Sequence, residues 1–206
     1  MKTLSILSQK GGATKTTLVI HLAVAAEQQG KKVAIIDLDP QASAAKWKDL
    51  RPGDTPAVIT AQASRLSYFL DIAKNAGADL AIIDTAPHSD NIAVAAARSA
   101  DFILIPTKCS ILDLQTISST VDIIQLIKTP AAIVLSSVPV RGMTESFARE
   151  ALVALGVEIS PYSIGDRAAF RNATNEGLTA QEYEPKGKAA QEIQNLYEWV
   201  SQKLEL

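Results

Sequence analysis

Residues 10–17 decide the fold of this chain, and they read Lys10-Gly11-Gly12-Ala13-Thr14-Lys15-Thr16-Thr17. An apolar run from Thr3 to Leu7 precedes them and predicts a strand, whereas the apolar spacing over residues 16–29 predicts a helix. A glycine-rich turn between a strand and a helix lets backbone N–H groups approach phosphate oxygens, and the helix N-terminus adds about half a positive charge. The lysine of such a turn reaches the β and γ phosphates of a nucleotide, and the hydroxyl that follows binds Mg²⁺. The stretch therefore predicts a phosphate-binding loop.

The rest of the chain alternates short apolar runs with longer helical patterns. After the first strand, strands are predicted over residues 33–36, 57–60, 80–83, 102–105, 131–135 and 157–159. Helices are predicted over residues 64–75, 92–99, 113–127, 144–155 and 187–204. This order predicts an α/β fold, a doubly wound, mostly parallel sheet with helices on both faces, in a single domain spanning residues 1–206. The least regular stretch, residues 171–187, predicts a surface loop.

Composition excludes several classes of protein. The chain has 206 residues, 47% of them hydrophobic, which is enough for a core and too apolar for a disordered chain. No apolar run reaches the ~18 residues of a membrane span, and the N-terminal run is interrupted too soon for a signal peptide. A single cysteine, Cys109, forms no internal disulfide and cannot alone hold an iron–sulfur cluster, which favours a reducing cytoplasm. The net charge of −2 does not indicate a nucleic-acid ligand, although a local basic patch is compatible with it.

The phosphate loop resembles the deviant Walker A box of the ParA/MinD family of ATPases, which is written KGGxGK[ST][ST]. The first glycine of the ordinary pattern is replaced by Gln9, and Lys10 stands where this family has its signature lysine. The resemblance implies a P-loop NTPase fold in which all of residues 10–17 bind ATP and Lys15 is catalytic. It also implies that Lys10 is catalytic across the interface of an ATP-bound homodimer, where it reaches the nucleotide of the partner subunit.

Thr14 departs from the pattern, because the family has glycine at this position. A β-branched residue is poorly suited to the positive φ that glycine allows, and such strain costs about 1–3 kcal/mol. Strain of that size, met on binding, would lower nucleotide affinity by about one to two powers of ten. We therefore expect Thr14 to weaken ATP binding or hydrolysis, or to hold the loop in one state, and Thr14→Gly to tighten ATP binding or raise turnover.

Acidic residues follow two of the predicted strands. The stretch Asp37-Leu38-Asp39-Pro40-Gln41 is similar to the D-x-D-P-Q switch I of the same family, and Asp84-Thr85-Ala86-Pro87 looks like its Walker B with switch II. The resemblance implies that Thr16, Asp37 and Asp84 serve the Mg²⁺ ion and that Asp39 positions the hydrolytic water. Taken singly, each acid is better explained as a helix cap or a loop residue. The order of the three motifs, each at the carboxyl end of a strand, favours the ATPase interpretation.

The last third of the chain also resembles the family, and there the implied partner is DNA, bound without sequence preference. The candidate contacts are Arg167, Arg171, Lys186 and Lys188. Phosphate contacts of this kind require lysine and arginine but no readout of bases, and a solvated charged face is the alternative for any one of them. The resemblance also implies an adenine pocket, which would be built around Ser136, Ser137, Pro139 and residues 161–166.

The resemblance covers nearly the whole chain and matches the short ParA type. It implies a Mg²⁺-dependent ATPase that forms a sandwich dimer with ATP, binds nucleoid DNA in the cytoplasm and segregates plasmid or chromosome DNA. A small centromere-binding or cargo adaptor protein would stimulate hydrolysis, and no membrane partner is expected.

Four alternatives stay open. The cargo can be a protein compartment rather than DNA. The chain can be a membrane-associated ATPase of the MinD kind, but residues 192–206 carry a net charge of −2 that anionic lipid repels, so a packed helix is the better explanation. A metabolic ligase of the same fold is disfavoured by Lys10 and by the D-x-D-P-Q stretch. A protein that binds nucleotide without hydrolysing it, because of Thr14, is the fourth.

Overall fold

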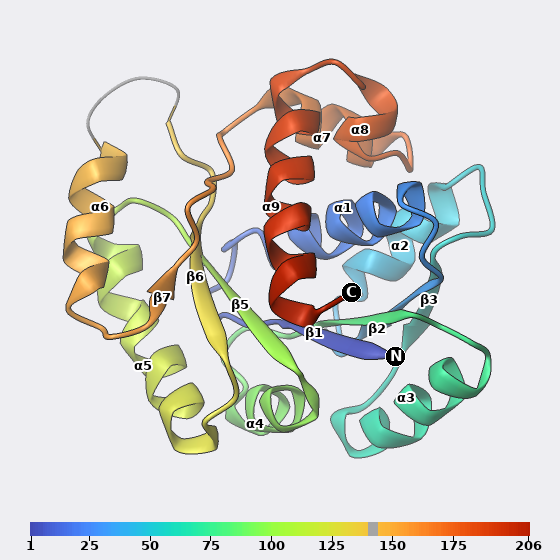
Figure 1. Ribbon diagram of the computed structural model, residues 1–206, viewed down its shortest axis with the longest axis horizontal. Coiled ribbons are helices and arrows are strands. Elements are labelled where there is room, and N and C mark those ends of the chain that lie inside the picture. Colours follow the sequence, from blue (N-terminus) through green and yellow to red (C-terminus); the bar gives the residue numbers. More distant parts are fainter. Residues whose placement is uncertain (140–143) are drawn as a thin grey trace.

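The centre of the molecule is a seven-stranded sheet in which every neighbouring pair of strands is parallel (Figure 1). The computed structural model describes residues 1–139 and 144–206. The spatial order is β3-β2-β4-β1-β5-β6-β7. The strands are β1 (Lys2–Ile6), β2 (Val33–Asp37), β3 (Ala57–Thr60), β4 (Leu80–Asp84), β5 (Phe102–Thr107), β6 (Ala131–Leu135) and β7 (Glu158–Ile159). The predicted parallel α/β sheet is confirmed.

Helices cover both faces of this sheet (Figure 1). They are α1 (Lys15–Gln28), α2 (Ser43–Leu50), α3 (Leu66–Asn75), α4 (Asp90–Ser99), α5 (Ile111–Ile127), α6 (Thr144–Val153), α7 (Ala168–Asn175), α8 (Ala180–Tyr183) and α9 (Lys188–Leu204). Residues on α1, α2 and α7–α9 share one apolar cluster, whereas residues on α4–α6 share another on the opposite face. Successive strand residues alternate between the two faces, so that Leu104 joins the first cluster and Ile103 the second.

The C-terminal helix α9 packs on α1 and β1. Leu196, Val200 and Leu204 are buried there, and the Trp199 ring lies edge-on to Phe102 with ring centroids 6.0 Å apart. The prediction of a packed helix is confirmed, since its apolar face lies inside the fold. Over residues 1–139 and 144–206, no helix is long and apolar enough to cross a membrane.

Two parts of the secondary structure were predicted wrongly. Helix α2 was not predicted, because only Ala44 and Trp47 of its eight residues are buried and they give little periodicity. The surface loop predicted over residues 171–187 is wrong as well, since this stretch holds most of α7 and all of α8. Short helices of this kind depend on tertiary packing rather than on their own pattern.

Gly177 joins α7 to α8 and lies against the end of α2. Its φ is +70°, and a Cβ placed on it would lie 2.4 Å from the backbone carbonyl carbon of Leu50. Only glycine therefore permits this approach between backbones that are far apart in the sequence.

Gly177→Ala should destabilise the protein, by about 2 kcal/mol or more in urea unfolding, because it adds a backbone clash to an unfavourable φ. Gly156→Ala is the matched control, since Gly156 has φ +65° but nothing within 4 Å of the added Cβ. Equal losses in the two variants would show that the contact with α2 contributes nothing.

Candidate nucleotide-binding site

The predicted phosphate loop joins β1 to α1, and the space beside its glycines is open. Gly12 has φ +69°, and a Cβ on Gly11 or Gly12 would meet no atom within 4 Å. The first turn of α1 has no side-chain cap and no acidic residue, so its N–H groups and positive dipole end are available to an anion. A cavity of about 260 Å³ lies over this turn, lined by residues that include Gly12, Lys15, Thr16 and Asp39. The arrangement is that of a phosphate cradle.

Lys15 is the buried cation of this cradle. Its ammonium group donates to the carbonyl of Lys10 at 3.1 Å, and its side chain lines the cavity. Burial lowers the pKa of Lys15, while the charges of Asp84 and Asp39 oppose that shift. An anionic phosphate would supply the counter-charge that this buried lysine favours.

The two strand-end carboxylates lie opposite each other in the sheet. Asp37 of β2 pairs in register with Asp84 of β4, and both side chains are buried. The Thr16 hydroxyl donates to Asp84 Oδ2 at 2.7 Å, so the three predicted metal residues are brought to one place. Asp84 Oδ1 is buried and has no hydrogen-bond partner among the residues that the structure describes. Burial, with the nearby Asp37 charge, raises the pKa of Asp84 to about 7 and outweighs the Thr16 hydrogen bond.

This donor set fits Mg²⁺ in the way that nucleotide sites hold it. A hard cation accepts hydroxyl and carboxylate oxygens, and it would satisfy the unpartnered Asp84 oxygen. Within the described residues, no group of three His, Cys, Asp or Glu side chains could hold a metal ion alone. Mg²⁺ sites that use one or two carboxylates take their remaining ligands from water and substrate phosphates.

Asp39 lies at the rim of the same cavity, where a water-positioning residue is expected. Its Oδ1 accepts from the Gln41 N–H at 2.9 Å, and its own N–H donates to Asp37 Oδ1 at 3.0 Å. The carboxylate is therefore fixed by the backbone turn that follows β2. Its catalytic role stays a prediction.

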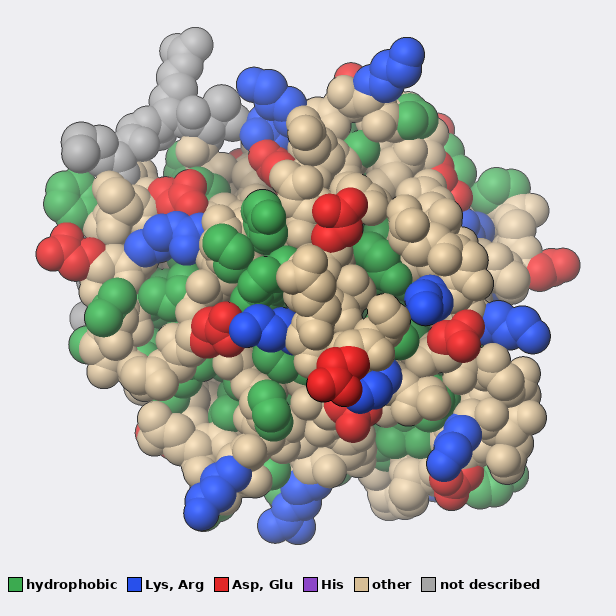
Figure 2. Space-filling model, in the orientation of Figure 1, with side chains coloured by type: hydrophobic (Ala, Val, Ile, Leu, Met, Phe, Trp, Pro, Cys, Tyr) green, Lys and Arg blue, Asp and Glu red, His purple; other side chains and the backbone are tan. Residues whose placement is uncertain are grey.

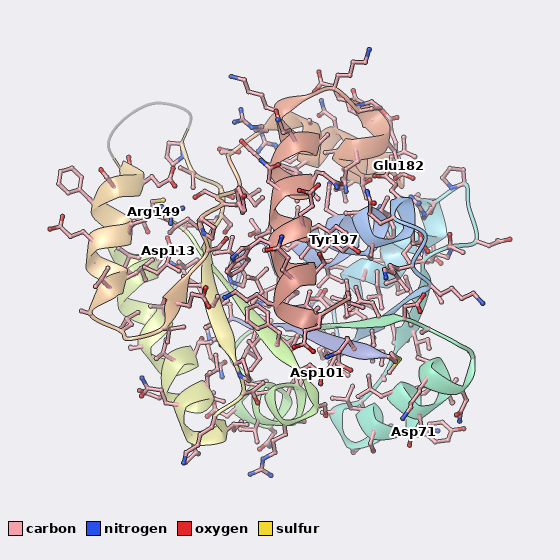
Figure 3. The ribbon with its side chains drawn as sticks, viewed as in Figure 1. Asp71, Asp101, Asp113, Arg149, Glu182 and Tyr197 are labelled. Carbon is pink, nitrogen blue, oxygen red and sulfur yellow. The ribbon has the colours of Figure 1, made fainter. Side chains whose placement is uncertain are left out.

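Lys10 does not enter the cavity of its own chain. Its ammonium group lies 2.5 Å from Asp113 Oδ1 in the first turn of α5 (Figure 3), where the Ser110 hydroxyl also donates to Asp113. Burial alone would raise the pKa of Asp113, but the hydrogen bonds from Lys10 and Ser110 outweigh it and hold the pKa below its usual value. This partner of Lys10 was not predicted, because Asp113 also fits an ordinary acid in the first turn of a helix.

A second cavity of about 190 Å³ adjoins the phosphate cradle on the side where the base pocket was expected. Its lining includes Thr14, Ser137, Asp166, Phe170 and Arg171. Ser137 and residues 164–166 of the predicted base pocket line this cavity, and their contact with a base stays a prediction. Ser136 is buried and its hydroxyl donates to the Thr107 carbonyl at 3.3 Å, and Pro139 is not part of the lining.

The four candidate DNA contacts fall into two pairs. Arg167 donates to Glu192, and Arg171 donates to Asp166 at 2.9 Å, so carboxylates already engage both arginines. Lys186 and Lys188 flank the start of α9 and are exposed, and neither forms an ion pair with a described residue. The view in Figure 2 shows lysine and arginine side chains projecting at the edge of the molecule where α7 and α9 begin.

Comparison with known proteins decides the family. A model of the CobQ/CobB/MinD/ParA nucleotide binding domain matches residues 4–180. The chain belongs to this family. Within it, the relatives include the "Maintenance of carboxysome distribution protein A" of Halothiobacillus neapolitanus, 30% identical over 91% of this chain and 90% of that protein. Protein IncC of Escherichia coli is 29% identical over 100% of this chain and 71% of its own length.

A solved structure of the ParA/MinD type shows the same fold. The septum site-determining protein MinD from Pyrococcus horikoshii, complexed with Mg-ADP, has a TM-score of 0.77 and 20% identity over 97% of this chain and 95% of that one. The family match and the relatives confirm the predicted resemblance to the ParA/MinD family, and nucleotide binding is a property of that family. The role of each site residue stays a prediction.

Thr14 adopts the left-handed conformation that its position predicts. Its φ is 63° and its ψ is 19°, and its hydroxyl donates to the Ala13 carbonyl at 2.6 Å. This strain belongs to the folded loop itself, so it opposes folding as well as function.

We expect Thr14→Gly to raise the free energy of unfolding by about 1 kcal/mol, since relief of the strain outweighs the entropy of glycine. It should also tighten ATP binding or raise turnover. Urea unfolding and ATP titration measure the two effects. Thr17→Gly is the control for stability, because Thr17 is helical and the same change there should destabilise the protein. Unchanged stability, affinity and turnover in Thr14→Gly would contradict the strain argument.

Proposed function

We propose that this chain is a Mg²⁺-dependent ATPase that closes into a sandwich dimer with ATP and distributes a cargo over nucleoid DNA in the cytoplasm. The observation that carries the proposal is the position of Lys10. Its backbone carbonyl belongs to the phosphate loop, whereas its ammonium group lies outside the loop's cavity on α5. A lysine in this position is better placed to contact the nucleotide of a second subunit than the nucleotide of its own chain.

The residues of the chain have separate tasks in this proposal. Lys15 and the N–H groups of α1 hold the β and γ phosphates, and Thr16 with Asp84 holds Mg²⁺, which neutralises phosphate charge when bound. Asp39 orients the attacking water from the rim of the cavity. Lys10 of the second subunit adds positive charge beside the γ-phosphoryl group while that group passes from ADP to water. Positioning and charge supply most of the rate in phosphoryl transfer, so no covalent step by the protein is needed.

Non-specific DNA is the proposed track. Lys186 and Lys188 are exposed at the start of α9, and two copies of this pair in a dimer would contact more phosphates than one. The near-neutral net charge favours a contact that depends on dimerisation and is therefore reversible.

Two kinds of cargo compete in this proposal. A plasmid or chromosome, linked by a small centromere-binding protein, is the first. A protein compartment, linked by an adaptor, is the second, and it is supported by the relative whose name refers to carboxysome distribution.

Retention on random-sequence DNA tests the proposal. Protein with Mg²⁺ and a slowly hydrolysed ATP analogue should be retained, protein with ADP should not, and retention should fall as salt rises. A variant with Lys186→Ala and Lys188→Ala should lose retention but keep ATP binding. Lys74→Ala with Arg98→Ala, two exposed cations on α3 and α4, is the control. Equal retention in ATP and ADP would contradict the proposal.

A further inference from the structure

Helix α2 connects the nucleotide site to the C-terminal segment of residues 168–183. Its first turn is hydrogen-bonded to the nucleotide site, and its other end is hydrogen-bonded to that segment. At its start, Asp37 Oδ2 accepts from the Ala44 N–H at 3.1 Å. The same carboxylate is one of the predicted metal residues, and its Oδ1 holds the backbone of Asp39. A shift of Asp37 when nucleotide binds would therefore reach the first turn of α2 through this hydrogen bond.

The other end of α2 is fastened to α7 and α8 across 131 residues of sequence. Arg51, which follows the last turn, donates to both carboxylate oxygens of Glu182 at 2.9 and 2.8 Å. The Trp47 indole donates to the Leu178 carbonyl at 3.1 Å, and the Arg51 guanidinium lies over the Trp47 ring at 4.9 Å. Glu182, labelled in Figure 3, accepts in turn from the N–H and hydroxyl of Thr179.

This attachment is tight enough to transmit a displacement. The Arg51 side chain is only 8% exposed, and the missing side chain of Gly177 lets the backbones of residues 50 and 177 meet. A bidentate arginine–carboxylate pair also fixes direction as well as distance. A helix of eight residues is about 12 Å long and rigid on that scale.

The segment held by α2 is the one that carries candidate ligand contacts. Phe170 and Arg171 of α7 line the base-side cavity together with Thr14, and Gln181 of α8 donates to the His21 carbonyl on α1 at 2.8 Å. The stretch from Tyr183 to Lys188 leads directly from α8 to the proposed DNA lysines.

We infer that Arg51 and Glu182 are positioning residues that couple the state of the nucleotide site, through α2, to the placement of α7–α8 and the DNA-binding lysines. The inference rests on the proposed function for its DNA readout only. The coupling is a difference between two affinities, so it is measured as the ratio of DNA affinity in ATP to DNA affinity in ADP.

Trp47 supplies a readout that needs neither DNA nor turnover. The chain has two tryptophans, so Trp199→Phe leaves Trp47 as the single emitter. In this parent, Mg²⁺ with an ATP analogue should change Trp47 emission relative to ADP. Arg51→Met, which keeps the apolar stem but loses the bonds to Glu182, should abolish that change while ATP affinity stays within a few-fold.

The ratio of DNA affinity in ATP to DNA affinity in ADP should change in the same variants. Typical coupling energies correspond to 5–150-fold, so we expect a ratio of at least ~10 in the parent and a ratio near 1 in Arg51→Met. Arg51→Lys keeps the charge without the planar fork and should retain part of the ratio. It also serves as the test variant if Arg51→Met does not fold. Arg65→Met is the matched control, because the Arg65 guanidinium also lies over an aromatic ring, that of Tyr68 at 4.8 Å, on α3.

The outcomes separate this inference from the proposed function. A parent that shows no ATP-dependent DNA retention contradicts the proposed function, and Trp47 emission then decides the coupling alone. A parent with a normal ATP switch, together with an Arg51→Met variant that matches it in emission and in DNA ratio, overturns the coupling and leaves the proposed function standing.

Discussion

Replacing Asp84 by asparagine should make the nucleotide-free protein more stable at pH 8 and abolish its Mg²⁺-dependent nucleotide binding. Asp84 is completely buried, and one of its carboxylate oxygens has no partner. Burial raises the folded-state pKa from 3.8 to about 7. The folded state therefore holds this proton more tightly than the unfolded chain does. The stability that comes with it is complete below pH 3.8 and is lost as pH rises through about 7.

The loss at pH 8 is on the order of 4 kcal/mol, since each unit of pKa shift corresponds to 1.36 kcal/mol. Asparagine has nearly the same shape and never ionises, so Asp84→Asn should recover about 2–4 kcal/mol at pH 8 and almost nothing at pH 4. Urea unfolding at pH 4, 6 and 8 without nucleotide measures this, and calorimetry with Mg²⁺ and ATP measures the loss of binding.

Asp113→Asn is the control with the opposite sign. The Lys10 and Ser110 hydrogen bonds hold the pKa of Asp113 low despite its burial, so removal of its charge should destabilise the protein at pH 8. A gain in Asp84→Asn that is equal at pH 4 and pH 8 would show that ionisation of Asp84 is not its cause. Retained Mg²⁺-dependent binding would show that Asp84 does not serve the metal.

Lys10→Ala should abolish ATP-dependent dimerisation while leaving ATP binding by the monomer within a few-fold of the original. The Lys10 ammonium contacts Asp113 rather than the cavity of its own chain, so its loss removes little from that cavity. Without the dimer, the cation that Lys10 would supply at the transferring phosphate of the partner subunit is also missing, and the loss of one such group costs about 10²–10³ in turnover.

Light scattering with a slowly hydrolysed ATP analogue measures the dimer, and a fluorescent nucleotide measures monomer binding. Lys108→Ala removes a neighbouring lysine near the same Asp113 and should leave dimerisation intact. Normal dimerisation of Lys10→Ala would refute the role of Lys10 in trans.

Much of the site was predictable because its residues lie in short motifs at the ends of strands. Residues 10–17, Asp37 and Asp84 each follow a buried apolar run, and parallel strands bring their carboxyl ends to one edge of the sheet. The pairing of Asp37 with Asp84 in register is a consequence of that topology.

The parts that escaped prediction depend on contacts between distant segments. Lys10 meets Asp113 across 103 residues, and Arg51 meets Glu182 across 131. Neither pairing leaves a local pattern, since Asp113, Arg51 and Glu182 each fit an ordinary charged residue when taken alone. Helix α2 was missed for the same reason. Trp47 is its one large buried side chain, and its indole is hydrogen-bonded to the Leu178 carbonyl, which is far away in the sequence.

The contact between Lys10 and Asp113 has a kinetic consequence for the proposed dimer. Each subunit arrives with its lysine already engaged by a carboxylate of its own chain. In the proposed dimer, an encounter is productive only when the ion pairs of both subunits have opened. Association should then be slower than orientation alone requires, and it should accelerate when moderate salt loosens the internal pairs. In the proposed dimer, the strength of the Lys10–Asp113 ion pair would therefore influence how fast two ATP-bound subunits assemble.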